Sequence, residues 1–119
     1  MTAGGAYPLR SQAQSYPTKP IKVVVGYAAG GAVDIVARTL GQSLTTSLGQ
    51  PVVPDNRPGA GTVIGSELTA KAPPDGYTVL AMTNSHVINA AIQKDLPYDA
   101  LKDFAEISLL AVSPYMLVI

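Results

Sequence analysis

The apolar residues of the chain begin a regular pattern at residue 21. The β-branched residues Ile21, Val23, Val24 and Val25 form a run that ends at Gly26, which is typical of a strand buried on both faces of a parallel sheet. After a glycine-rich loop, apolar residues recur every three or four positions over residues 33–48, which predicts an amphipathic helix. Gly49 and Pro51 provide the stop. This segment is therefore predicted to be a strand followed by a helix.

The strand–helix unit is then repeated. We expect a short strand at 52–53 that Pro54 interrupts, a helix from about residue 62 to residue 72, a strand over 77–82, a helix capped by residues 83–85, a helical turn at 101–104, and strands over 107–112 and 115–119. Two of the helices place an acid four residues before a base, Asp34 before Arg38 and Glu67 before Lys71. The alternation predicts an α/β fold with parallel strands and flanking helices.

In sheets of this kind, ligands bind beyond the carboxyl ends of the strands, where loops lead into helices. Three loops meet this description, at residues 27–34, 57–62 and 83–89. Each presents unpaired backbone amides at the positive end of a helix dipole, which contributes roughly 0.3–1 kcal/mol to holding an anion. Charged hydrogen bonds add about 1.5–3 kcal/mol each. The loops therefore suit a small anion, although glycines that only form tight turns would produce the same sequence.

Composition excludes several classes of function. The chain has 119 residues, of which 47% are hydrophobic and 13% charged, and its formal net charge is zero. A neutral surface does not attract nucleic acid, and no apolar run reaches the roughly 20 residues needed for membrane insertion. With no cysteine and one histidine, His86, we expect no disulfide, no metal site and no cofactor.

Residues 1–16 differ from the rest because they lack a periodic apolar pattern. Ala13, Gln14 and Ser15 are similar to the small-residue end of an export signal, but a basic start and an apolar stretch of about 7–15 residues are missing. We interpret residues 1–16 as a leader remnant that is disordered. Residues 17–119 are interpreted as one α/β lobe that is incomplete at its carboxyl end.

Two motifs suggest enzymes. The segment from Gly59 to Gly65 is similar to the dinucleotide fingerprint G-x-G-x-x-G, but it has one residue too many before the last glycine and follows its strand too late. A nucleotide-binding enzyme fragment that uses this loop is the alternative function. Ser85 and His86 are neighbours at a helix start and point in different directions, so a capping serine and a solvent-edge or ligand-facing histidine are favoured over a catalytic pair.

A series of short motifs occurs in a fixed order along the chain. They are YPTKPIK at 16–22, GYAAGGAVDIVAR at 26–38, LGQPVV at 48–53, NRPGAG at 56–61, APPDGYT at 72–78, LPYD at 96–99 and KDF at 102–104. With these motifs the chain resembles the Bug family, the receptors of tripartite tricarboxylate transporters, over residues 16–119. Two departures are Ala29, where the family usually has proline, and Ala32, where it usually has a third glycine.

The resemblance implies a periplasmic-binding-protein fold of type II, with two lobes that close on a small organic acid. It also implies a periplasmic receptor that works with membrane transporter subunits and is not an enzyme. The residues expected to bind the ligand are Tyr27, Ala28, Gly30, Gly31 and Asp34 in one jaw, Thr83, Asn84, Ser85, His86 and Asn89 in the other, and Gly59, Ala60 and Gly61 nearby. Asp34, in the first helical turn beside Arg38, also fits a structural role.

Family members are much longer, so the chain is expected to be truncated near the first crossing to the second lobe. The last segment, from about residue 107, is then an apolar, strand-forming tail without a partner. Exposed apolar strands favour association. We therefore expect a homo-oligomer that forms through this tail. A truncated module that assembles but binds no ligand is a third alternative.

Overall fold

The computed structural model describes residues 15–119 and confirms the alternation of strands and helices. The elements are β1 (Ile21–Val25), α1 (Ala32–Leu48), β2 (Val52–Asn56), the short 3-10 helix η1 (Ala60–Thr62), α2 (Val63–Ala70), β3 (Thr78–Ala81) and α3 (Ser85–Ile92). Helix α1 ends where the sequence predicts, because Gly49 adopts the left-handed conformation and its N–H bonds to the carbonyl of Thr45 at 3.1 Å.

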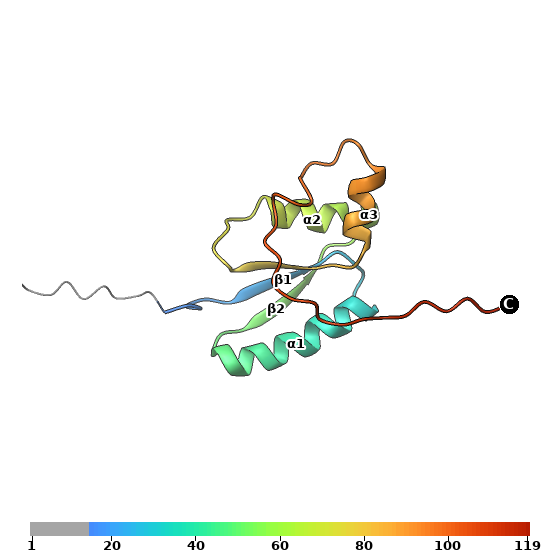
Figure 1. The fold of residues 1–119 in the computed structure, drawn as a ribbon. Coiled ribbons are helices and arrows are strands. Elements are labelled where there is room, and N and C mark those ends of the chain that lie inside the picture. Colours follow the sequence, from blue (N-terminus) through green and yellow to red (C-terminus); the bar gives the residue numbers. More distant parts are fainter. Residues whose placement is uncertain (1–14) are drawn as a thin grey trace, which may run out of the picture.

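The three strands form one parallel sheet in the order β2-β1-β3. Strand β1 lies in the centre, where Ile21 pairs with Val52 and Lys22 pairs with Thr78. Helix α1 covers one face of the sheet, and α2 and α3 lie on the other side (Figure 1). The carboxyl ends of all three strands therefore meet at one edge of a three-layered lobe.

The core lies mainly between β1 and α1. Its buried members are Ile21, Val23, Val25, Ala37, Val52 and Ala81. On the opposite face, a Cβ added to Gly65 of α2 would lie 3.1 Å from the Cα of Gly26 and 3.5 Å from the Cγ1 of Val24. This close approach requires glycine at position 65, and it fixes α2 against the end of β1. Both faces of β1 are therefore covered, as its continuous apolar run predicts.

Strand β2 continues through Pro54, although the sequence predicts that this proline interrupts it. Proline cannot donate to a neighbouring strand, but within residues 15–119 β2 pairs with β1 on one side only, and an edge strand accommodates a proline. The prediction that the strand stops at Pro54 was therefore wrong. Its extension to Asn56 carries that side chain to the edge of the sheet where the loops converge.

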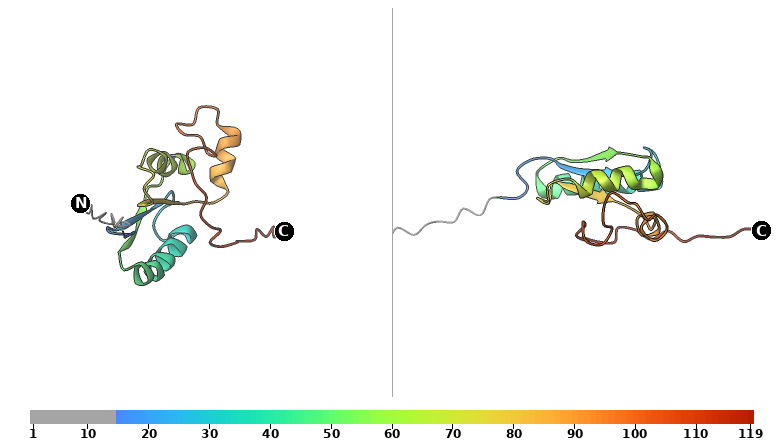
Figure 2. Two further views of the ribbon diagram at one scale, coloured as in Figure 1. Left: turned by 60° about the vertical axis from the view of Figure 1, so that its left-hand side comes forward. Right: turned by 90° about the horizontal axis from the view of Figure 1, so that it is seen from above.

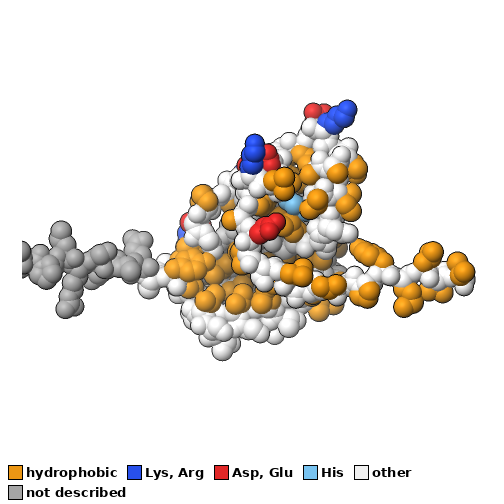
Figure 3. All heavy atoms as spheres, viewed as in Figure 1, with side chains coloured by type: hydrophobic (Ala, Val, Ile, Leu, Met, Phe, Trp, Pro, Cys, Tyr) orange, Lys and Arg blue, Asp and Glu red, His pale blue; other side chains and the backbone are white. Residues whose placement is uncertain are grey.

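The two strands predicted over 107–112 and 115–119 are not formed. Within residues 15–119 this segment has no sheet partner, and its large apolar side chains are exposed. It extends away from the layered lobe in both views of Figure 2, and its apolar side chains project at the right of Figure 3. A strand forms only with a neighbour to bond to, which sequence alone does not provide.

The predicted leader, residues 1–16, lies outside the described residues up to residue 14. Tyr16 belongs to the described part, where its hydroxyl donates to the carbonyl of Gly76 at 2.6 Å and its ring lies 5.1 Å from that of Tyr77. In the described range, 15–119, no helix combines the length and the apolar character that crossing a membrane requires.

Candidate functional site

The three predicted loops converge at the carboxyl edge of the sheet. The hydroxyl of Tyr27, after β1, lies 2.5 Å from the Oγ1 of Thr83 and 2.6 Å from the Oγ of Ser85, both after β3. The Thr83 and Ser85 oxygens are 3.1 Å apart, so the three hydroxyls form a closed triangle, here called the hydroxyl triangle. The Oγ1 of Thr62, from the loop after β2, lies 3.5 Å from Ser85. One hydroxyl-rich surface therefore joins all three loops.

A buried carboxylate holds the first loop. Asp34 is only 2% exposed, and its Oδ2 accepts hydrogen bonds from the Nε of Arg38 at 2.8 Å and the backbone N–H of Gly30 at 2.9 Å. These donors, together with the amide of Asn56, hold the pKa of Asp34 far below its ordinary value, and the carboxylate in turn raises the pKa of Arg38. An ionised carboxylate fixed in this way is a poor proton acceptor. Asp34 is therefore better suited to holding the first loop in place than to acting as a general base.

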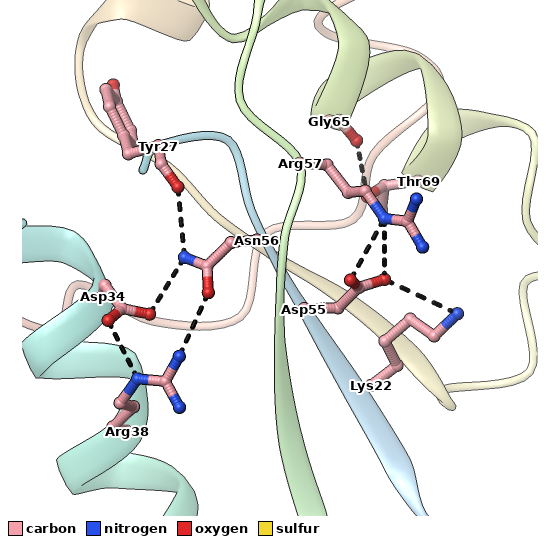
Figure 4. A network of polar contacts seen from close by, with 9 residues as sticks. All are labelled: Lys22, Tyr27, Asp34, Arg38, Asp55, Asn56, Arg57, Gly65 and Thr69. Carbon is pink, nitrogen blue, oxygen red and sulfur yellow. Dashed lines mark hydrogen bonds and ion pairs between the residues drawn. The ribbon is translucent and has the colours of Figure 1, made fainter. Parts of the chain in front are cut away.

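Asn56 connects that carboxylate to the end of β1 (Figure 4). Its Nδ2 donates to the Oδ1 of Asp34 at 2.9 Å and to the carbonyl of Tyr27 at 3.1 Å, and its Oδ1 accepts from the Nη2 of Arg38 at 3.1 Å. We call Asp34, Arg38 and Asn56 the Asp34 brace. Asn56 is not among the residues predicted from the sequence. A polar residue at the end of a strand that is paired in parallel with β1, opposite Val25, is nevertheless a signal for a side chain at the edge where ligands bind.

The loop after β2 has an unusual backbone. Gly59, Ala60, Gly61 and Thr62 all have positive φ, of 133°, 48°, 62° and 83°. Thr62 is β-branched and buried, and such residues rarely adopt this conformation. Asn89 of α3 donates through Nδ2 to the carbonyl of Gly61 at 2.6 Å and to the Oγ1 of Thr62 at 3.4 Å. Asn89 is therefore near the site, where it holds this loop in its left-handed path.

Thr62 also explains why a glycine, Gly26, follows β1 directly. A Cβ added to Gly26 would lie 3.0 Å from the Cβ of Thr62. Thr62 is not among the predicted site residues, because no pattern in the sequence indicates a β-branched residue at positive φ. The segment from Gly59 to Gly65 makes a left-handed turn over residues 59–62 before α2 begins, and this is not the tight strand-to-helix turn of a dinucleotide fold.

His86 lies away from the hydroxyl triangle, contrary to the prediction that it faces the ligand or the solvent edge. It is 2% exposed, its Nδ1 is 3.2 Å from the Oγ of Ser66, and its ring packs against those of Tyr98 and Phe104. Consecutive residues at a helix start point about 100° apart. Ser85 therefore faces the triangle, whereas His86 faces the interior, and the two form no catalytic pair.

The remaining predicted residues lie on the exposed surface of the same loops. These are Ala28, Gly30 and Gly31 in the first loop, Gly59, Ala60 and Gly61 in the second, and Asn84 in the third. No group of three acidic, histidine or cysteine side chains within residues 15–119 is placed to hold a metal ion. A hollow of about 340 Å³ lies elsewhere, between α1 and β2, and is lined by Arg38, Gln42, Thr45, Val52 and Pro54.

The chain is similar to proteins of known class. Residues 36–119 match the model of the tripartite tricarboxylate transporter family receptor. The protein BugT of Bordetella pertussis is 42% identical over 119 residues, which are 98% of this chain and 36% of that protein. The chain therefore spans about a third of the length of the curated relatives it matches.

Solved structures lead to the same group of proteins. The periplasmic binding protein BugD is 40% identical and superposes with a TM-score of 0.72, over 75% of this chain and 30% of that one. MatC of Rhodopseudomonas palustris, solved with bound malate, is 35% identical with a TM-score of 0.74, over 80% of this chain and 33% of that one. An R. palustris protein solved with adipate has a TM-score of 0.68 at 35% identity, over 71% of this chain and 29% of that one. The fold is that of a portion of a periplasmic binding protein.

Proposed function

The chain belongs to the tripartite tricarboxylate transporter receptor family, and from that premise we propose that it forms the first lobe of a periplasmic receptor. The receptor captures a small organic carboxylate and delivers it to membrane transporter subunits. Members of this family are receptors and not enzymes, so the nucleotide-binding enzyme alternative is set aside. No catalytic turnover is expected.

The observation that supports this proposal is the convergence of three loops on the hydroxyl triangle. Hydroxyl groups and the N–H groups at helix starts are the donors that a carboxylate needs. The bound ligands of two similar structures, malate and adipate, are dicarboxylates. A dicarboxylate is therefore the ligand class proposed here, with one carboxylate held by this lobe.

The proposed contacts divide the predicted residues into two groups. We assign ligand contacts to groups in three loops: Tyr27, Ala28, Gly30 and Gly31 in the first jaw, Thr83, Asn84 and Ser85 in the second, and Gly59, Ala60 and Gly61 beside them. Tyr27 and Ser85 are half-buried, and the others are exposed. Asp34 and Asn89 are bonded to the protein itself and hold these loops in place. His86 is assigned no ligand contact because of its burial.

The test is a thermal-shift panel on the intact receptor with malate, adipate, citrate, benzoate, ATP and NAD. A ligand at 100 times its Kd stabilises the folded state by about 2.7 kcal/mol, so a binding acid raises Tm measurably. Ser85→Ala should reduce the shift, and the exposed residue Gln42 of α1, changed to alanine, serves as the control. Stabilisation by ATP or NAD, with none by any acid, would refute the proposal.

We also propose that copies of this 119-residue chain associate through residues 107–119. Within residues 15–119, β3 has a neighbour on one side only, and the apolar side chains of 107–119 are exposed. An open edge and an unpaired apolar segment favour pairing between copies. Light scattering across a dilution series should show oligomers, and a version that ends at Asp103 should be smaller. A monomer at high concentration, or unchanged assembly by the shortened version, would contradict this.

A further inference from the structure

The hydroxyl triangle uses all of its own hydrogen atoms. Each of Tyr27, Thr83 and Ser85 has one O–H donor, and the three oxygen pairs are 2.5, 2.6 and 3.1 Å apart. Three hydrogens oriented around the ring satisfy three contacts, and the backbone N–H of Ser85 adds a further bond to Thr83 at 3.3 Å. The triangle therefore presents lone pairs, and no free O–H, to a ligand that approaches it.

A carboxylate accepts hydrogen bonds and donates none. In the ring, one of the Thr83 and Ser85 hydroxyls donates to Tyr27, and Tyr27 donates to the other. A carboxylate therefore gains these O–H groups only if the ring opens at Tyr27. The phenol oxygen of Tyr27 lies within hydrogen-bond distance of both hydroxyls at once, which is the position that one carboxylate oxygen would take. Tyr27 and the ligand therefore compete for the hydroxyl that donates to Tyr27 in the ring.

We propose that the Tyr27 hydroxyl is an internal competitor of the ligand and that it sets the affinity of the site by having to be displaced. This inference rests on the proposed function. A carboxylate can displace the phenol because charged hydrogen bonds are about twice as strong as neutral ones. Only the side chain has to move, because the carbonyl of Tyr27 remains anchored by Asn56.

If Tyr27 competes with the ligand, removal of its hydroxyl should strengthen ligand binding, whereas the loss of a side-chain contact at a binding site ordinarily weakens it. Tyr27→Phe keeps the ring, which packs against the core, and removes the competing oxygen. Two neutral hydrogen bonds no longer have to be broken on binding, so affinity should increase by about tenfold. A tyrosine that donates to the ligand, or one with a structural role only, predicts weaker binding instead.

The experiment measures the Kd of malate and of adipate by calorimetry on the intact receptor, as wild type, Tyr27→Phe, Ser85→Ala and Tyr77→Phe. Tyr77→Phe is the matched control, since it removes a phenol oxygen that contacts the N–H and hydroxyl of Thr18 at 2.8 and 3.2 Å, at the opposite end of the sheet. Wild type should also give a tyrosine absorption difference on ligand addition, which Tyr27→Phe loses and Tyr77→Phe retains.

Tighter binding by Tyr27→Phe supports the inference, as does binding that only this variant shows. Equal or weaker binding by Tyr27→Phe, together with weaker binding by Ser85→Ala, overturns the inference and leaves the proposed function standing. If neither acid binds wild type or Tyr27→Phe, the proposed function fails and the inference fails with it.

Discussion

Helices α1 and α2 each carry an acid four residues before a base, but the two pairs have different surroundings. The Asp34 side chain is 3% exposed and is bonded to Gly30 and Asn56 as well as to Arg38. The Glu67 side chain is 33% exposed, and its partner Lys71 is largely in solvent. The Asp34–Arg38 pair connects helix α1 to the loop after β1 and to strand β2, whereas the Glu67–Lys71 pair lies on the surface of α2.

The difference shows that the location of a charged pair determines how much it contributes to the stability of the fold. Helix α1 begins at the loop after β1, so an acid in its first turn can reach backbone and side-chain donors from two other segments. Exposed pairs contribute little because water screens them. The Asp34 brace therefore gives the site beside the hydroxyl triangle a fixed frame.

Asp34→Asn should produce the largest effect. The new amide cannot accept from all three donors, and it places an NH₂ group or a neutral oxygen against Arg38, Gly30 and Asn56. We expect Tm of the intact receptor to fall by about 5 °C, together with weaker binding of the carboxylate. Thermal denaturation and calorimetry measure the two effects. An unchanged Tm would show that the hydrogen bonds to the Asp34 carboxylate do not stabilise the fold.

Asn56→Ala should have the next largest effect. The carbonyl of Tyr27 loses its donor, and Asp34 retains its two other partners. We expect a loss of stability of about 1–2 kcal/mol and carboxylate binding about tenfold weaker. Urea denaturation and calorimetry, with Gln42→Ala on the same side of the lobe as the control, test this. Full affinity in Asn56→Ala would show that the first jaw needs no anchor.

Acidification should reduce the stabilisation by the Asp34 brace gradually, whereas the two substitutions remove part of it at once. The pKa of Asp34 is lower in the folded protein than its ordinary value of 3.8, so its stabilising contribution is complete well above pH 3.8. It is lost progressively as the pH falls below that value towards the folded pKa. Urea midpoints between pH 6 and pH 3 should therefore fall more steeply for wild type than for Asp34→Asn. Parallel curves would contradict the assignment.

Glu67→Gln should have the smallest effect. An exposed pair at this spacing contributes about 0.3–0.5 kcal/mol, and salt reduces it further. We expect a change in stability within 0.5 kcal/mol and no change in ligand affinity. Urea denaturation at low and high salt measures it. A loss comparable to that of Asp34→Asn would remove the distinction between the two pairs.

The sequence was sufficient to predict the order of elements and the edge at which the loops meet, because apolar periodicity and glycine positions depend on local physics. It also predicted the spacing of both charged pairs. It did not show that Asn56 would join Asp34, since that contact depends on which strands are neighbours in the sheet.

The errors have similar causes. His86 was expected near the ligand, but packing against Tyr98 and Phe104 decided its direction. Thr62 could not be predicted as a site residue, because its positive φ depends on tertiary contacts, including that with Asn89. The strands over 107–119 were predicted from β propensity, which requires a partner that residues 15–119 do not supply.

The central position of β1 has a consequence for how the polypeptide reaches its native state. Of these three strands, β1 is synthesised before β2 and β3, so Lys22 can pair with Thr78 only after both later strands have been made. Pairings between residues far apart in sequence form slowly, because long loops must close first. Until β3 emerges, the nascent chain exposes the apolar residues of β1, and a chaperone that binds short aliphatic stretches would find its best target at Ile21–Val25.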